Sequence, residues 1–419
     1  GAGIGAGGNL GSNTRGFGAN GSWIVQDDLT IIRRAHTIRV GFEHRKYYYN
    51  TRPLSGSGDF VFSPVATHQP GFAAQTGHSF ASFLLGAATS ASRGVALTTT
   101  GFRWTQTGFY IMDDWKVKPR LTINMGMRWE IIGGFYEQLD RMSIVDPFKP
   151  NPGASNRPGA FVFADELGGG SFQDRYWKMF GPRFGFAYKA TDKMVVRGGY
   201  SLMNMPPIAY GFGFGFATNG FNGSINIPGG INPSGSADDP SFYLHSRFPD
   251  LTAVLPNKDP GQLLFTGQSV VSRDSNRLPY VQNWDFTVQY QLPRQTVLEV
   301  AYIGNKGTRL PDDGHASLNQ LPASAFALGE TLLAQVGSRP EFRPYANFPN
   351  NQIVGQALRP FPQYTGLGES FMFSGTSLYN SMQVTLTRHF SKGFAMLTAY
   401  TFSKALATNM LEEHGRAVA

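Results

Sequence analysis

Residues 283–304 read NWDFTVQYQLPRQTVLEVAYIG, and this stretch decides how the rest of the chain is interpreted. In its first half, apolar side chains alternate with polar ones, which is the period of a strand with one apolar and one polar face. Pro293 indicates a turn, because proline presets φ for the second turn position and cannot donate to a strand ladder. Alternation resumes at Thr296, so the stretch predicts a β-hairpin.

The same unit recurs along the chain. Five hairpins are predicted near residues 23–49, 101–130, 180–202, 281–304 and 378–404, separated by the long connections 50–100, 131–177, 203–280 and 305–377. Short turns at one edge of a sheet and long loops at the other are typical of a transmembrane β-barrel, while structureless loops of this length are rare in soluble sandwiches. Strand parity places all the tight turns at one rim and all the long connections at the other.

The predicted fold is therefore all-β: an antiparallel transmembrane β-barrel segment, about ten strands of a larger barrel, with short periplasmic turns and long extracellular loops. Residues 1–22 are rich in glycine, asparagine and serine and are expected to form a loop that enters the barrel. Residues 23–404 are the barrel segment, and 405–419 are a truncated end that leads into the next loop. Within the connections, 80–86 predict a helical turn or a short strand, and 322–335 predict a short helix.

The composition narrows the class of protein. Charged residues are only 15%, while the 51 glycines and the 14% of aromatic residues favour strands, turns and loops over helices. No apolar run approaches the roughly 18 residues of a membrane helix, which excludes a helical membrane protein. The absence of cysteine excludes disulfides and thiolate metal sites. The net charge of +8 comes from scattered side chains, so no nucleic-acid partner is predicted. Without a signal peptide or initiating Met, the chain is expected to be an internal piece of a longer protein.

The sequence contains none of the short patterns that mark hydrolases, zinc peptidases, nucleotide-binding loops or calcium-binding loops, so no enzyme, catalytic residue or cofactor is predicted. Residues 312–315, DDGH, could offer oxygens to a calcium ion, but such a sequence is more often a turn, and no metal site is predicted. The alternating glycine and phenylalanine run 211–216 could contact a ligand, although local packing of its rings is the favoured alternative. The candidate ligand-binding residues in this connection are Phe212, Phe214, Phe216 and Phe221.

Charged side chains recur on the polar parity of the predicted strands. On a barrel this face lines a wet lumen, where a charge carries little desolvation cost. These side chains are expected to hydrate the lumen and to brace a plug rather than to bind substrate. The candidate lumen-facing residues are Arg39, Glu43, Arg45, Arg128, Glu130, Arg183, Arg197 and Glu299.

Eight segments carry a resemblance to a known family. The longest, 113–130, reads DDWKVKPRLTINMGMRWE; the others are PRFGFAY (182–188), VRGGY (196–200), LEVAYIGNKGTR (298–309), NQLP (319–322), RPFPQY (359–364), YNSMQV (379–384) and AYTFSKA (399–405). Together they resemble the TonB-dependent outer-membrane receptors, specifically the Oar-like branch with a carboxypeptidase-regulatory-like N-terminal domain. The resemblance covers most of the chain.

The resemblance implies a receptor in the bacterial outer membrane whose long loops capture a ligand. Transport would then follow displacement of a plug domain, powered from the inner membrane. The implied partners are outer-membrane lipid, a plug domain, the TonB system and an unknown ligand. This chain shows about ten strands where the family's barrel has about twenty-two, and it shows no plug, no TonB-contacting segment and no terminal aromatic strand. It therefore resembles the middle of such a barrel.

Two further functions remain open from the sequence. A surface adhesion or scaffold barrel would use the same loops without transport, and a plug domain upstream in the full gene would argue against it. A secreted, soluble β-rich binding protein would show the same alternation and would stay in solution without detergent.

Overall fold

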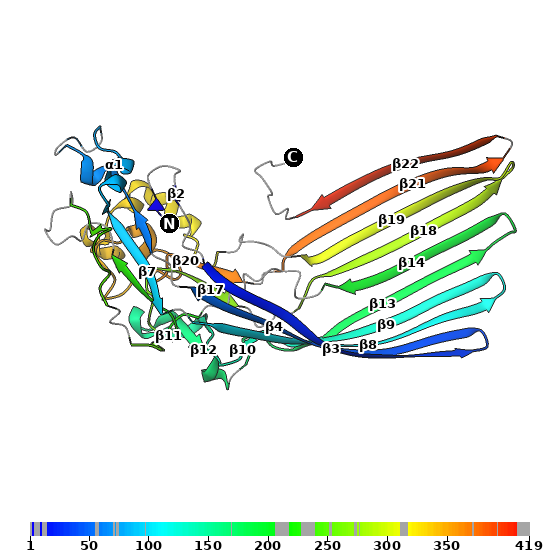
Figure 1. Ribbon diagram of the computed structural model, residues 1–419, viewed down its shortest axis with the longest axis horizontal. Helices are drawn as coiled ribbons and strands as arrows, with labels where there is room; N and C mark the ends of the chain where they lie inside the picture. The colour runs from blue at the N-terminus through cyan, green and yellow to red at the C-terminus, as the bar shows by residue number, and fades with distance from the viewer. Residues whose placement is uncertain are drawn as a thin grey trace.

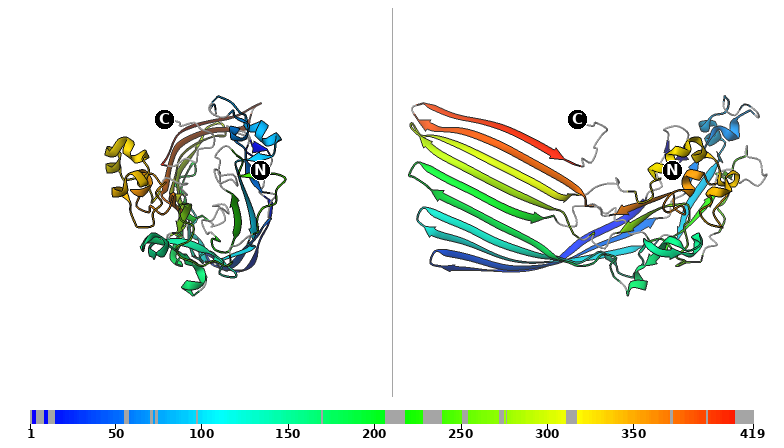
Figure 2. Two further views of the ribbon diagram at one scale, coloured as in Figure 1. Left: turned by 90° about the vertical axis from the view of Figure 1, so that its left-hand side faces the viewer. Right: turned by 180° about the vertical axis from the view of Figure 1, so that it is seen from behind.

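The computed structural model describes residues 2–3, 9–10, 15–54, 58–69, 72, 75–96, 98–168, 170–205, 218–227, 239–250, 254–271, 275, 277–310, 317–370, 373–391 and 393–408. One large antiparallel sheet occupies one half of the molecule, and shorter strands and helical turns gather at one of its ends (Figure 1). Seen from the end and from behind, the large sheet is strongly curved (Figure 2).

Ten long strands build this sheet in sequence order, each paired with its neighbour along the chain. They are β3 (Arg15–Arg33), β4 (His36–Leu54), β8 (Thr100–Lys118), β9 (Leu121–Ile132), β13 (Tyr176–Lys189), β14 (Met194–Asn204), β18 (Tyr280–Leu292), β19 (Thr296–Leu310), β21 (Gly375–Ser391) and β22 (Phe394–Ala407). The short β10 (Tyr136–Glu137) also pairs with β8. Since β3 and β22 are the two ends of this order, the described sheet is open.

The first strand begins earlier than the sequence predicts. Residues up to 22 are expected to be loop, whereas β3 starts at Arg15 and its first residues pair with the end of β4, Gly18 with Thr51 and Ser22 with Tyr47. Tyrosine rings of β4 lie across the glycines of β3: a Cβ at Gly21 would come within 2.2 Å of the Tyr48 hydroxyl oxygen. The rings thus supply the packing that the glycines lack. At the other end, β22 continues to Ala407, beyond the predicted limit at 404.

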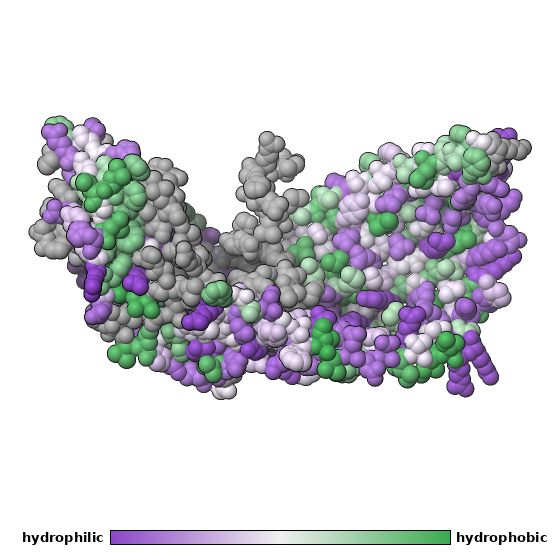
Figure 3. Space-filling model, in the orientation of Figure 1, coloured by the Kyte–Doolittle hydropathy of each residue, from purple (hydrophilic) through white to green (hydrophobic). Residues whose placement is uncertain are grey.

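The tight turns and the long connections lie at opposite ends of the strands, as the sequence predicts. The five turns between paired strands all fall at the right-hand end in Figure 1, and the long connections all leave from the other end. We name these ends the turn rim and the loop rim. Hydrophilic side chains line the turn rim in the space-filling view (Figure 3).

Short elements order the long connections and the segment before β3. These are β1 (Ala2–Gly3), β2 (Asn9–Leu10), β5 (Asp59–Val61), η1 (Pro64–Thr67), α1 (Ser79–Leu84), β6 (Ala87–Ala88), β7 (Ser90–Ala96), β11 (Ser143–Asn151), η2 (Pro152–Ala154), β12 (Arg157–Phe163), η3 (Ala164–Leu167), β15 (Gly223–Ile227), β16 (Phe242–Tyr243), β17 (Gly267–Val271), η6 (Ala323–Leu333), η7 (Val336–Ser338), η8 (Pro340–Phe342), α2 (Val354–Ala357) and β20 (Gly366–Ser370). Strand pairs join different connections: β7 pairs with β15, β6 with β16, and β17 with β20. The connections therefore form one layer at the loop rim, here called the loop layer.

Two open points of the sequence are resolved in the loop layer. The stretch 80–86 is helical rather than extended, because α1 covers Ser79–Leu84. The helix expected at 322–335 is a 3₁₀ helix, η6, interrupted at Gly329 by a φ of 53°. No helix among the described residues is both long enough and apolar enough to span a membrane.

Three of the hydrophobic clusters lie within the loop layer. Two others join it to the large sheet, one through Tyr47, Phe102 and Trp104 of β4 and β8, and one through Ile132 and Met179 of β9 and β13. One cluster joins Val145 and Phe161 of one connection with Val270 of the next and Tyr364 of the third. The largest fully buried side chains include Trp104, Tyr364, Phe62, Phe161 and Phe163. Burial of large apolar side chains from different connections explains why these glycine- and proline-rich segments adopt a fixed arrangement.

Candidate functional site

The large sheet has an apolar and a polar face, fixed by the strand register. On the apolar face, Ile111, Met125, Phe184 and Phe286 stay 41–53% exposed. An apolar surface this extensive is unfavourable in water and requires an apolar environment. The sheet is therefore built to stand between a hydrocarbon phase and a wet interior.

An aromatic row crosses the apolar face of four neighbouring strands. Phe42, Phe109, Trp129 and Phe180 lie opposite one another in register on β4, β8, β9 and β13. Their ring centroids are 5.3, 5.8 and 6.0 Å apart in turn. Aromatic rings at one height around a sheet are the girdle that marks a membrane interface in strand-built membrane proteins.

Four of the candidate charges pair with one another on the polar face. A Glu43 carboxylate oxygen lies 3.2 Å from Nη2 of Arg45, and its other oxygen lies 3.5 Å from Nη2 of Arg128. Nε of Arg128 in turn donates to Glu130 at 3.0 Å. Two positive and two negative side chains thus form a neutral chain across β4 and β9.

Two uncharged side chains close this chain into a ring. Gln106 donates to the Glu130 carboxylate at 3.0 Å and accepts from the Tyr47 hydroxyl at 3.1 Å, and Arg45 donates to that hydroxyl oxygen at 3.3 Å. Glu130 is only 7% exposed, and its charge is compensated by Arg128 and Gln106. Since the ring has no uncompensated charge, it orders the wall rather than offering a group to a ligand.

Other charges on the same face remain without an ion pair. Within the described part of the chain, Arg39, Arg183 and Glu299 have no charged partner, while Arg197 donates to Gln289 at 3.1 Å. Arg39 and Arg183 are the outer members of one ladder rung, with Met112 and Gly126 between them. They line a hollow of about 220 Å³ together with Arg128, Tyr110, Met112 and Met127.

A second hollow of about 260 Å³ adjoins the first, and both are lined by Met112 and Arg183. Its polar lining includes the carboxylates of Asp114 and Asp285 and the amides of Asn124 and Asn283. All eight predicted lumen charges lie on this one face. The pairing of four of them depends on the register between strands, which alternation within a strand cannot supply.

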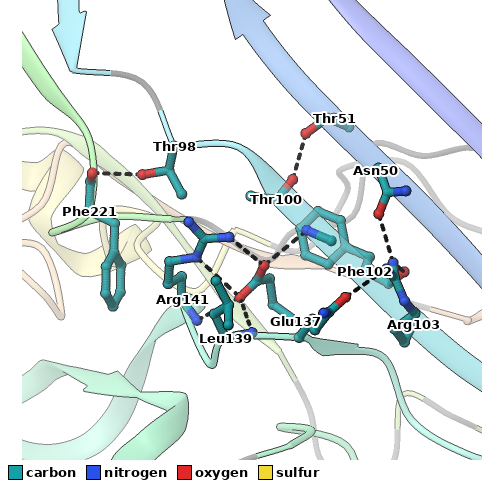
Figure 4. Close-up of polar contacts among 12 residues, drawn as sticks. Asn50, Thr51, Thr98, Thr100, Phe102, Arg103, Glu137, Leu139, Arg141 and Phe221 are labelled. Carbon is teal, nitrogen blue, oxygen red and sulfur yellow. Dashed lines mark hydrogen bonds and ion pairs between the residues drawn. The ribbon is translucent and has the colours of Figure 1, made fainter.

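Glu137 fastens the loop layer to β8 (Figure 4). Its buried carboxylate accepts hydrogen bonds from the backbone of Gly101 at 2.9 Å and Leu139 at 2.8 Å, and from the Arg141 guanidinium at 3.0 Å. Burial alone would raise the pKa of Glu137, but the side-chain and backbone hydrogen bonds of Arg141 and those of Gly101 and Leu139 outweigh it, so that the pKa lies below its ordinary value. The carboxylate therefore remains charged at neutral pH.

A second polar cluster joins two of the segments that carry the family resemblance. Asn319 donates to the carbonyls of Phe361 at 3.0 Å and Tyr364 at 2.7 Å, and accepts from the Phe361 amide at 2.8 Å. Arg359 donates to the Asn319 carbonyl at 2.7 Å. The segments 319–322 and 359–364 are thus two halves of one structural contact.

Tyr364 continues this contact into another connection. It is fully buried, and its hydroxyl donates to the Gly159 carbonyl of β12 at 2.9 Å and accepts from the Asn151 amide at 3.2 Å. Burial raises the pKa of Tyr364. Glu137 does not stand out in the sequence, and Asn319 does so only as part of segment 319–322. The contacts of Glu137 with Gly101 and of Asn319 with Phe361 and Tyr364 join residues far apart along the chain.

The predicted ligand-contacting phenylalanines are described only in part. Phe212, Phe214 and Phe216 lie outside the described residues, as does the stretch 312–315. The Phe221 ring packs edge-to-face on Phe163 at 6.2 Å and lies 5.8 Å from the Lys258 ammonium, while its carbonyl accepts from Thr98 at 2.7 Å. Phe221 is therefore packed within the loop layer. In the part of the chain that the structure describes, no three His, Cys, Asp or Glu side chains are placed to hold a metal ion.

Comparison with known families decides the class. The model of the outer membrane beta barrel domain matches residues 2–417, nearly the whole chain. The chain belongs to this family. The barrel domain is thus located in the outer membrane, its turn rim faces the periplasm and its loop layer faces the cell exterior. A secreted, soluble binding protein, one of the three functions left open by the sequence, is excluded.

Several solved structures are similar to the barrel domain at low identity. The alcaligin outer membrane receptor FauA from Bordetella pertussis shares 9% identity, with 94% of this chain and 41% of that chain covered and a TM-score of 0.36. The outer membrane transporter YddB from Escherichia coli shares 8%, with 92% and 33% covered and a TM-score of 0.42. The chain spans less than half the length of these proteins. No curated protein matches the chain.

Proposed function

We propose that the barrel domain is part of a TonB-dependent, Oar-like receptor that captures a ligand at the cell surface and transports it across the outer membrane. The observation that carries this proposal is the contact between segments 319–322 and 359–364, which both resemble that family. Here they hold the loop layer together through Asn319 and Tyr364. A layer fixed in this way offers a preorganised binding surface, which reduces the entropic cost of capture.

The polar face supplies the wall of the proposed passage. Its neutral ring stiffens β4, β8 and β9. Arg39 and Arg183 have no ion-pair partner among the described residues and remain available to groups inside the barrel. In the proposed receptor this space holds a plug domain that moves when the TonB system acts. The domain needs no catalytic group for this role, and we propose none.

The full-length gene tests the proposal. The measurement compares which solutes are removed from the medium by the parent strain, by a strain that lacks this gene and by a strain that lacks TonB. We expect both mutant strains to leave in the medium the same class of solute, which the parent strain takes up. Equal depletion in all three strains, combined with loss of surface attachment in the null strain, would favour the adhesion barrel instead. Equal depletion without any change in attachment would contradict both functions.

The capturing segment can be tested separately in the full-length protein. Deletion of residues 211–217, which carry Phe212, Phe214 and Phe216, should reduce uptake and leave membrane insertion intact, because stacking surfaces are removed without altering the paired strands. Deletion of 230–236 removes the same number of residues from the same connection without removing an aromatic ring. Equal uptake by both deletion variants would remove the phenylalanine run as the site of capture.

A further inference from the structure

The apolar face ends in lysines at one common height. β4 begins at His36 and carries Lys46 ten positions further; β19 begins at Thr296 and carries Lys306 ten positions further; β22 begins at Phe394 and carries Lys404 ten positions further. A strand of about 9–11 residues crosses the hydrocarbon core of a bilayer. These three ammonium groups therefore stand at the extracellular interface of the membrane.

Each lysine lies on the apolar face, is exposed, and is opposed by uncharged residues. Lys46 is paired with Trp23 and Thr105, Lys306 with Gln282 and Leu378, and Lys404 with Asn380. None of the three has an ion-pair partner among the described residues. A positive charge at the membrane interface without a protein counterion attracts an anionic group of the membrane surface.

The lysines of β19 and β22 lie closest together. Lys306 shares a rung with Leu378 and Leu406, and Lys404 is two residues from Leu406, so their Cα atoms are roughly 12 Å apart from the strand spacing and rise. Two four-carbon side chains can bring both ammonium groups to one anion across this separation. The anion would lie over β21, between the two strands.

Asn380 of β21 completes the donor set between these lysines. Its side-chain oxygen accepts from the Tyr302 hydroxyl at 2.7 Å, which orients the amide and leaves its nitrogen without a partner in the described part of the protein. Below this group, on the membrane side, Tyr302, Met382 and Phe402 are 44–66% exposed. Cationic and amide donors thus stand directly above an apolar surface.

We propose that Lys306, Asn380 and Lys404 bind the phosphate group of a lipid in the outer leaflet. The donors match a phosphate, and the exposed apolar side chains beneath them match the acyl chains of the same molecule. A free phosphate would gain nothing from the apolar surface, which is why the lipid is the favoured occupant. This site lies outside the barrel and does not depend on the transported ligand.

The test measures binding of lipid A to the purified full-length protein in a zwitterionic detergent by isothermal titration calorimetry. We expect the double variant Lys306→Gln, Lys404→Gln to bind lipid A about thirtyfold more weakly than the unmodified protein, because each interfacial lysine contributes on the order of a fivefold change in affinity. Dephosphorylated lipid A should bind both proteins with equal, weak affinity. The single variant Asn380→Leu should weaken binding by a smaller factor.

The control variant is Lys116→Gln, Lys118→Gln, which removes the same charge at the turn rim. It should bind lipid A as tightly as the unmodified protein, and both double variants should keep the heat-sensitive gel mobility of a folded barrel. Equal binding by the Lys306, Lys404 variant and the unmodified protein would overturn the proposal. So would an equal loss in the control variant, or displacement of lipid A by inorganic phosphate at the same concentration.

Discussion

At the scale of single residues, large rings lie against glycines on the neighbouring strand. The clearest case is Trp284 on β18, whose indole covers Gly304 on β19: a Cβ at Gly304 would come within 2.1 Å of the indole nitrogen. The glycine leaves the space in which the ring lies flat, and the ring covers backbone that glycine leaves bare. The two residues act as one packing unit, although neither shows this on its own strand.

Gly304→Ala should therefore destabilise the barrel, because the added methyl group forces the Trp284 ring out of its position. We expect a loss of about 1–3 kcal/mol in the free energy of unfolding, typical of overpacking, measured by urea titration in lipid vesicles. Gly366→Ala is the matched control, since no atom lies within 4 Å of its added Cβ. A similar change in both variants would show that the loss comes from the strand backbone and not from the ring.

Glu137 gives a pH-dependent prediction. Its pKa is lower in the folded protein than its ordinary value, so the carboxylate stabilises the loop layer at neutral pH, and this contribution is lost as the pH falls through the folded pKa. Glu137→Gln should reduce stability by about 3 kcal/mol at pH 7, because the buried end of Arg141 loses its counterion.

The difference in unfolding free energy between the unmodified protein and Glu137→Gln should shrink as the pH is lowered from 7 to 3. The rate at which a protease cleaves the loop layer of each protein at each pH gives the same comparison for this layer alone. Asp192→Asn is the control: this carboxylate lies exposed at the turn rim beside Lys189 and Arg120, where solvent screens it. A constant difference between the proteins across this pH range would contradict the role assigned to the Glu137 charge.

At the scale of strands, the two faces differ in what they tolerate. Ile123 lies on the apolar face of β9, and Asn124 lies on the polar face opposite Asp114. Ile123→Arg should cost about 2–4 kcal/mol near the bilayer midplane. Asn124→Arg should cost much less, because Asp114 can pair with the new guanidinium inside the wet lumen.

Both variants of β9 are folded into lipid vesicles. Their free energies of unfolding are then measured from the change in gel mobility as the urea concentration is raised. The chain has no cysteine, so single cysteines at the two positions also report the side of the sheet directly: a water-soluble maleimide should label position 124 and spare position 123. Equal labelling of the two positions would contradict the assignment of the faces.

The strands and their order follow from the sequence because a period of two is local information. Each strand with a clean alternation, such as Leu121–Ile132, is found where the pattern predicts it. β3 is longer than predicted because its first residues are held by the tyrosines of β4, a contact between strands. The same limit explains the site: the parity of Glu43 and Arg128 is encoded locally, but their ion pair depends on register across β8.

The loop layer was the least predictable element of the fold. Its segments show little periodicity, and their order comes from contacts such as Tyr364 with Gly159 and Asn319 with Phe361, which join residues far apart in sequence. The resemblance to a family marked 319–322 and 359–364 as special without showing that they touch. Hydrogen-bonding partners of this kind become visible only when the chain is folded.

At the scale of the whole molecule, the large sheet has two edges that pair with no further strand among the described residues. β3 and β22 end the strand order, and each presents a row of unpaired backbone groups along most of its length. Such groups are costly in hydrocarbon, so a membrane sheet must close or pair with further strands. We therefore expect β3 and β22 to pair with additional strands in the full-length protein.

Residues 1–419 expressed alone should accordingly fail to form a monomeric barrel in lipid vesicles. Far-ultraviolet circular dichroism should still show strands, because the hairpins are local, but the heat-sensitive gel mobility and the protease resistance of a closed barrel should be absent. The full-length protein, refolded in the same vesicles, should show both properties, and it controls for the lipid. A protease-resistant monomer of this chain alone would show that β3 and β22 can pair with each other, and that the curvature of the ten strands is sufficient for closure.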